Sequence, residues 1–155
     1  MSKINVLENK SLKLNNVLSR QVSENDVFVS AKHITMLNNY LKSNNLKSVG
    51  PVIFYSSGVV GVSSDGTAKI KNKLMIQLER GDIKVEYPYV LEQNIRLANC
   101  LYVKFKDEYK YFSYATSAIA LHSYNNDIDL TSEVYIINLS NSKESFEADV
   151  FMPIK

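Results

Sequence analysis

Few residues in this sequence have the chemistry of a metal ligand or a nucleophile. His33 and His122 lie far apart, and neither has a Cys, Asp or Glu three or four positions further on, the spacing that zinc sites use. Cys100 lies in an alternating strand pattern, and its nearest cations in the sequence are Arg96 and Lys104. A thiol becomes reactive when an adjacent base or cation favours the thiolate. We therefore expect no metal site and an unreactive, sheltered cysteine.

Phosphate-binding and catalytic motifs are also missing. Gly58, Gly61 and Gly66 fit neither of the glycine-rich loops G-x-G-x-x-G and G-x-x-x-x-G-K-[ST], and no helix is predicted after them. The 16 acidic residues include no pair with a catalytic signature. The sequence thus predicts no catalytic residue and no cofactor. An enzyme remains the third interpretation, behind two binding functions.

Aromatic residues are the most prominent chemical feature, with ten Tyr and six Phe. Tyr87 and Tyr89 flank Pro88, while Tyr111 and Tyr114 are three residues apart and therefore share one face of a predicted helix. Tyr is enriched in interfaces because its ring packs while its hydroxyl remains hydrated. These rings either cover a small sheet or form an exposed surface. We predict Tyr87, Tyr89, Tyr111 and Tyr114 as partner-binding residues.

Length and composition limit the class of protein. A chain of 155 residues and 17.6 kDa fits one domain, 1–155. The net charge is +2 with only three Arg, which argues against nucleic acid as a partner. The single cysteine suits a reducing compartment, and no stretch has the length of a signal peptide core or a membrane span. We expect a cytoplasmic protein without direct membrane insertion.

The elements that must position these side chains follow from hydrophobic periodicity. In the first half we predict a capping sequence at 23–26, a hairpin turn at Asp65-Gly66, strands at 13–22, 52–55, 59–62, 68–70 and 73–80, and a helix over 27–41. In the second half we predict strands at 95–105, 133–139 and 146–154, and a helix over 109–124.

Both halves therefore have the order strand, helix, strand, strand. Residues 12–55 align with 95–138 at an offset of 83 without a gap, yet only five of 44 positions are identical. The element order, and not the identity, therefore carries the prediction of an internal repeat. We expect an α+β fold with two helices packed on an antiparallel sheet and pseudo-symmetric halves at about 1–86 and 87–155.

This tandem order resembles the effector-binding domains of the GyrI-like superfamily, which occur in multidrug-sensing regulators. The resemblance rests on the helix followed by 50–55 (GPVIFY) and on the terminal segment 147–154 (EADVFMPI). It implies an acidic residue among aromatic rings that binds a lipophilic cation. Glu133, Glu147 and Asp149 are the acidic candidates. The candidate ligand-binding residues of this alternative are Glu133, Glu147, Tyr55 and Tyr135.

The chain also resembles the EsaE (EssE) family of type VII secretion accessory proteins of Gram-positive bacteria. The likeness lies in length, element order and the segments GPVIFY and FMPIK. It implies a non-enzymatic cytoplasmic adaptor or chaperone that binds a secreted nuclease toxin and brings it to the secretion machine, with peripheral membrane association through that machine. We take this adaptor as the leading function and small-molecule sensing as the alternative. No helix-turn-helix segment is expected before the domain, and we expect its interior to be filled by Leu, Ile and Val side chains.

Overall fold

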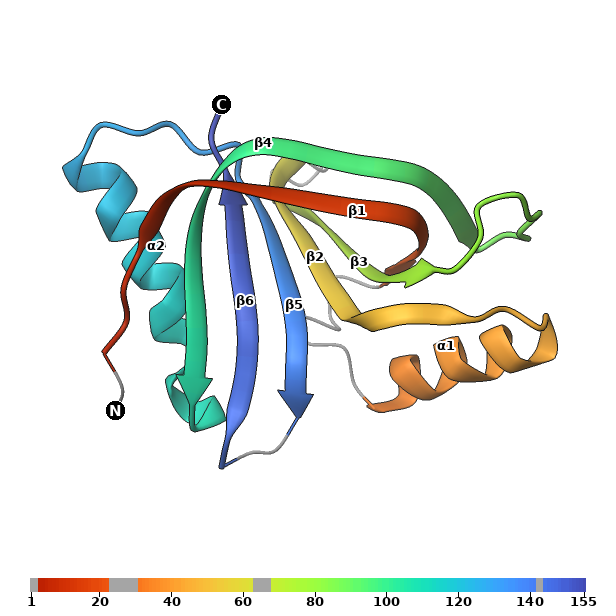
Figure 1. Ribbon diagram of the computed structural model, residues 1–155. Coiled ribbons are helices and arrows are strands. Elements are labelled where there is room, and N and C mark those ends of the chain that lie inside the picture. The colour runs from red at the N-terminus through yellow and green to blue at the C-terminus, as the bar shows by residue number, and fades with distance from the viewer. Residues whose placement is uncertain (1–2, 23–30, 63–67, 142–143) are drawn as a thin grey trace. The chain divides into compact units, whose positions relative to one another are not determined.

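The computed structural model describes residues 3–22, 31–62, 68–141 and 144–155 (Figure 1). It confirms the α+β class: six strands, two α-helices and one short 3-10 helix, with antiparallel strand pairs. The predicted capping sequence, the first residues of the first helix and the Asp65-Gly66 turn lie outside the described residues. The elements are β1 (Leu7–Val22), α1 (Ala31–Ser43), β2 (Ser48–Val62), β3 (Ala68–Leu78), β4 (Tyr89–Asp107), η1 (Tyr109–Tyr111), α2 (Ser113–Asn125), β5 (Glu133–Asn141) and β6 (Phe146–Pro153).

The chain forms two compact units. The N-terminal unit is Lys13–Ile95, and the C-terminal unit is Arg96–Lys155 together with Met1–Leu12. Each unit contains strands and one α-helix in the order β-α-β-β, where the first strand of each is a long one, β1 or β4. The boundaries between the units fall inside β1 and β4. The pseudo-symmetry of halves at 1–86 and 87–155 stays a prediction.

In the N-terminal unit, β3 pairs with both β1 and β2, and α1 runs along this sheet (Figure 1). Leu37 and Leu41 are one helical turn apart on α1 and bury the same face. They pack against alternate residues of β3, namely Leu74, Ile76 and Leu78. Because side chains alternate along a strand, the residues between these three point to the other face of the sheet.

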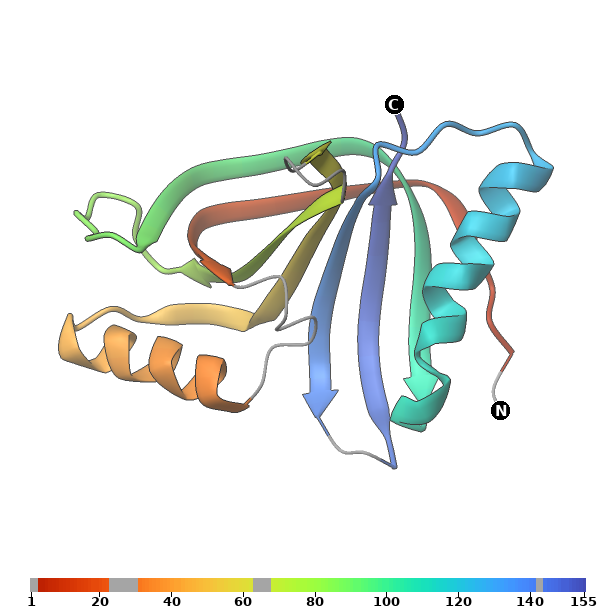
Figure 2. The ribbon, with the colours of Figure 1, turned by 180° about the vertical axis from the view of Figure 1, so that it is seen from behind.

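In the C-terminal unit, β6 pairs with β4 and β5, and α2 lies along the sheet (Figure 2). Ala115 and Ile119 of α2 are fully buried against alternate residues of β4 and β6. The rings of Phe105, Phe112 and Phe146 meet at one end of this core. Their centroids are 4.9 to 6.1 Å apart with edge-on or tilted planes, the arrangement that aromatic pairs prefer.

We expect substitutions at two nearby apolar positions of α2 to have very different effects on the free energy of unfolding. Ile119→Ala should lower the free energy of unfolding by about 2–5 kcal/mol because it leaves a cavity in the core. Leu121→Ala should change it by less than about 0.5 kcal/mol, because Leu121 is 61% exposed. Urea denaturation of both variants measures the difference. Equal losses at the two positions would contradict this packing of α2.

Candidate functional site

The strand register of the C-terminal unit places three aromatic side chains in one row across the sheet. Tyr102 of β4 and Tyr135 of β5 are both paired with Phe151 of β6. The neighbours Leu101 and Val150 pack in the core with α2, so Tyr102 and Phe151 project from the opposite face. The rings of Tyr102 and Phe151 have centroids 4.8 Å apart. We call this the aromatic row.

Acidic side chains of β6 lie beside the aromatic row. Asp149 and Glu147 precede Phe151 by two and four residues and therefore share its face. The Tyr102 hydroxyl donates a hydrogen bond to Asp149 Oδ1 at 2.5 Å. Glu147 lies 3.8 Å from the ammonium group of Lys104, which is largely exposed. The face thus combines a fixed carboxylate, a second carboxylate with an exposed partner, and aromatic rings.

The electrostatic environment keeps Tyr102 a hydrogen-bond donor. Burial raises the pKa of its phenol, and the hydrogen bond to Asp149 and the negative charges of Asp149 and Glu147 raise it further. The phenol is therefore protonated throughout the neutral pH range. An oriented donor fixes the position of the carboxylate that an incoming cation would meet.

The candidate ligand-binding residues of the GyrI-like resemblance are placed in different parts of the chain. Glu147 and Tyr135 lie on the face of the aromatic row, with Tyr135 buried. Glu133 begins β5, where its carboxylate accepts a hydrogen bond from the Thr131 hydroxyl at 3.4 Å. Tyr55 belongs to the N-terminal unit, where it is buried beneath the ammonium group of Lys73.

Tyr102 and Phe151 were missed by the sequence analysis. The signal for Tyr102 was present, because the alternation of residues 95–105 places it opposite the apolar face of Leu101 and Val103. Pairing of Tyr102 with Phe151 and Asp149 depends on the register of β4 against β6, and periodicity within one strand does not contain that register.

The predicted partner-binding tyrosines fall into two pairs. The rings of Tyr111 and Tyr114 stack with centroids 6.1 Å apart, and Tyr114 is half exposed. Tyr87 is 96% exposed in the N-terminal unit. Tyr89 contradicts the expectation of an exposed ring: it is buried, and it stacks on Tyr40 of α1 with centroids 3.9 Å apart. The physical reason is that the start of β4 contributes to the core beneath α1.

The outward face of α2 is apolar as well as its inward face. Tyr114, Leu121 and Tyr124 are exposed large hydrophobic side chains of this helix, and Tyr124 is exposed to 82%. α2 contains no Asp, Glu, Lys or Arg, and His122 is its one basic residue. A helix at a surface usually carries charged residues on its outer face. In the sequence, Tyr114, Leu121 and Tyr124 are seven and three residues apart, a spacing that predicts one shared face of a helix.

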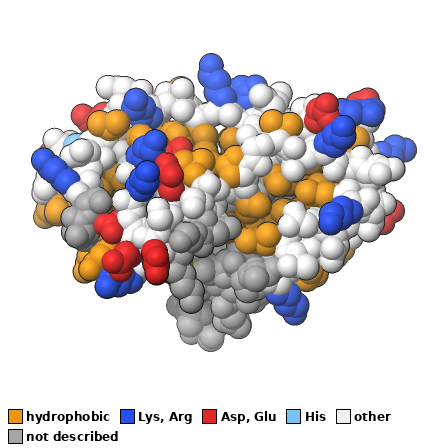
Figure 3. All heavy atoms as spheres, turned by 60° about the horizontal axis from the view of Figure 1, so that its bottom comes forward, with side chains coloured by type: hydrophobic (Ala, Val, Ile, Leu, Met, Phe, Trp, Pro, Cys, Tyr) orange, Lys and Arg blue, Asp and Glu red, His pale blue; other side chains and the backbone are white. Residues whose placement is uncertain are grey.

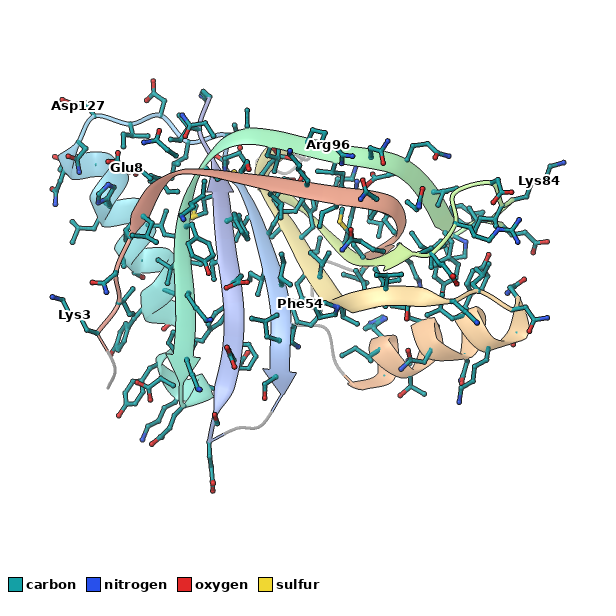
Figure 4. The ribbon with its side chains drawn as sticks, in the orientation of Figure 1. Lys3, Glu8, Phe54, Lys84, Arg96 and Asp127 are labelled. Atoms are coloured by element: carbon teal, nitrogen blue, oxygen red, sulfur yellow. The ribbon has the colours of Figure 1, made fainter. Side chains whose placement is uncertain are left out.

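His122 and Cys100 both belong to the C-terminal unit, and their surroundings differ. His122 Nε2 lies 3.7 Å from a carboxylate oxygen of Glu8, which projects from β1 beside α2 (Figure 4). Cys100 is fully buried, and desolvation raises the pKa of its thiol, so the thiol is the stable form at neutral pH.

The described part of the chain has neither a cluster of metal-ligand side chains nor a helix able to span a membrane. Within the described ranges, no three His, Cys, Asp or Glu side chains gather as metal ligands would. On the face seen in Figure 3, acidic (red) and basic (blue) side chains are interspersed over the surface. None of the described helices is both long enough and apolar enough to cross a membrane.

The fold is similar to those of several solved structures at low sequence identity. The EcmrR chain in its complex with DNA matches with a TM-score of 0.68 and 12% identity, over 99% of this chain and 57% of that chain. The EcmrR C-terminal domain matches with a TM-score of 0.60 and 11% identity, over 99% and 97%. The fold is GyrI-like. This chain thus spans little more than half the length of the EcmrR chain in the complex with DNA.

The GyrI-like fold does not by itself define an activity. A hydrolase from Listeria innocua matches with a TM-score of 0.56 and 7% identity, over 99% of this chain and 92% of that one. No family model matches the sequence, and no curated protein matches it. One fold is thus shared by a DNA-bound protein and a hydrolase, so the function has to be argued from the side chains.

The hydrogen bond of Tyr102 predicts that the stability of wild type and of Tyr102→Phe will depend differently on pH. Above pH 10, tyrosines of the unfolded chain lose their protons while Tyr102 in the folded chain keeps its proton, so stability should fall as pH rises from there. Tyr102→Phe should lose about 1 kcal/mol at pH 7 and show a shallower fall above pH 10. Urea denaturation from pH 7 to 11 tests this, with exposed Tyr124→Phe as the control. Parallel curves for wild type and Tyr102→Phe would contradict it.

Proposed function

We propose that this chain is a binding domain for a lipophilic organic cation, held at the aromatic row of the C-terminal unit. The observation that carries the proposal is the hydrogen bond from the Tyr102 hydroxyl to Asp149 beside the rings of Tyr102 and Phe151. The similarity to GyrI-like domains supports a binding domain. The charge of the ligand follows from the side chains.

The chemistry of the aromatic row favours a cation. Each aromatic ring attracts a cation over its face by about 0.5–2 kcal/mol. A carboxylate that is partly desolvated adds a stronger interaction, and Tyr102 holds Asp149 in place before a ligand arrives. Lys104 and Lys106 of β4 share this face, opposite Asp149 and Glu147 in the register, and compete with a ligand; the Lys104 ammonium is largely exposed and lies 3.8 Å from Glu147.

A matched pair of probes tests the sign of the ligand. Tetraphenylphosphonium and tetraphenylborate have the same shape and opposite charge. We expect the cation to bind with a dissociation constant of roughly 1–100 µM in isothermal titration calorimetry, and the anion to bind at least about tenfold more weakly at this face. Asp149→Asn should weaken cation binding at least about tenfold.

The control variant is Asp129→Asn, an exposed acid of the same unit with the same change of charge. It should bind the cation like wild type. Equal loss in both variants would show a general effect of net charge. Unchanged affinity in Asp149→Asn would reject the aromatic row as the site.

A second candidate function has its own observation, the uncharged outward face of α2. We propose as this alternative that the chain is an adaptor or chaperone for a secreted nuclease toxin and delivers it to a type VII secretion system. Tyr114, Leu121 and Tyr124 would form the core of the contact, with Tyr111 stacked on Tyr114. Aromatic residues at the centre of an interface contribute most of its binding energy.

Capture of the client distinguishes the two functions. Tyr114→Ala should weaken binding of the toxin by roughly thirtyfold, about 2 kcal/mol, while the melting temperature stays near that of wild type because the ring is half exposed. Affinity purification from the native host with mass spectrometry is the assay. Tyr114→Ala should leave phosphonium binding unchanged, and Asp149→Asn should leave client capture unchanged. Recovery of neither a secreted toxin nor a secretion component would reject the adaptor.

A further inference from the structure

A hollow of about 560 Å³ lies within the N-terminal unit, on the sheet face opposite α1. Lys71 and Lys73 of β3 line it, and they alternate with the residues that pack toward α1. Residues of the segment from Tyr87 to Glu92 line another side, and β1 closes the hollow with Ser19, Gln21 and Val22. Its volume falls in the range of small-molecule sites, ~300–1,000 Å³.

The acid of this hollow is already paired with a cation from the chain itself. Lys73 Nζ lies 2.8 Å from Glu92 Oε1, and the two side chains are only 16% and 29% exposed. The same ammonium group lies 5.2 Å from the centroid of the buried Tyr55 ring. Lys73 therefore occupies the position between a carboxylate and an aromatic face that a cationic ligand would need.

The remaining charge of the hollow is positive. Lys71 lies two residues before Lys73 on the same face, and it has no ion pair with another described residue. Among the described residues that line the hollow, the Lys73–Glu92 pair is neutral as a whole, so Lys71 leaves an excess of one positive charge. In the sequence, the N-terminal unit has ten Lys and Arg against seven Asp and Glu, a net +3. The hollow therefore attracts an anion.

Apolar surface is available next to these charges. Tyr87 is almost fully exposed, and Pro88 and Val90 line the hollow beside it. We propose that the hollow binds an amphipathic organic carboxylate, with its apolar part against Tyr87, Pro88 and Val90 and its carboxylate at Lys71 and Lys73. Lys73 sets the preference for an anion because it neutralises Glu92. The site belongs to the N-terminal unit alone and is independent of the proposed cation site.

Three probes with one ring system test the preference for charge. They are 1-naphthoate, 1-naphthylmethylammonium and the neutral 1-naphthylmethanol. For the wild-type chain we expect 1-naphthoate to bind with a dissociation constant of roughly 0.1–1 mM, and at least about tenfold more tightly than the ammonium probe. Calorimetry measures the affinities. Chemical-shift changes at the Val90 methyl groups locate the ligand.

Two variants of the ion pair should shift affinity in opposite directions. Glu92→Gln frees the Lys73 ammonium and should strengthen naphthoate binding several-fold. Lys73→Met leaves the Glu92 carboxylate unpaired, so it should weaken naphthoate binding several-fold and strengthen binding of the ammonium probe. Both changes break the same ion pair. A purely structural role for the pair would therefore move both variants in the same direction.

Two further variants keep the test decisive if the single changes disturb folding. Lys73→Met combined with Glu92→Gln restores the wild-type charge of the hollow and should retain the preference for naphthoate. Lys47→Met removes an exposed charge of the same unit outside the hollow and should bind every probe like wild type. The proposal is overturned if 1-naphthoate does not bind below 5 mM, if the ammonium probe binds as tightly as naphthoate, or if Glu92→Gln and Lys73→Met change naphthoate affinity in the same direction.

Discussion

The two-residue period of strand side chains is the constraint on which both candidate sites depend. In each unit one face of the sheet is buried under a helix, so the apolar side chains that pack there fix which residues lie on the other face. In β6, Val150 faces α2, and therefore Asp149 and Phe151 cannot. A slip of one residue would place the Asp149 carboxylate in the core. The free energy of burying it there would exceed the small net stability of a domain of this size. The register of the core thus determines the register of the site.

Much of the fold could be predicted because periodicity is local. The apolar spacing of 109–124 predicted a helix, and η1 and α2 occupy nearly this range. Strand ends were predicted less well. Two short strands are predicted at 52–55 and 59–62, but β2 runs as one strand from Ser48 to Val62. Gly50 has a φ of +84°, and the pairing with β3 shifts between Val49 and Ile53, which is where a strand tolerates proline.

The candidate sites were less predictable because their partners are distant in the sequence. Tyr102 and Asp149 are 47 residues apart, and Lys73 and Glu92 are 19 apart. Alternation along a strand predicts the face on which a side chain lies. Which side chains of that face come into contact depends on the pairing of the strands, and the sequence pattern of one strand does not contain that pairing. The same reason explains Tyr89. Its position after Pro88 suggested an exposed junction, whereas its packing on Tyr40 is a contact between a strand and a helix that no local pattern contains.

Two units of similar construction carry opposite arrangements of charge, and this shows why the fold alone does not determine the ligand. In the C-terminal unit the carboxylate of Asp149 is held by a neutral hydroxyl, which leaves its negative charge to attract a cation. In the N-terminal unit the carboxylate of Glu92 is held by an ammonium group, which cancels that charge. The difference is whether the side chain that holds the acid is that of Tyr102 or that of Lys73. We therefore expect that a change of one side chain at such a position would alter the charge that the proposed site prefers, because the side chains that fix the register lie on the opposite face of the sheet.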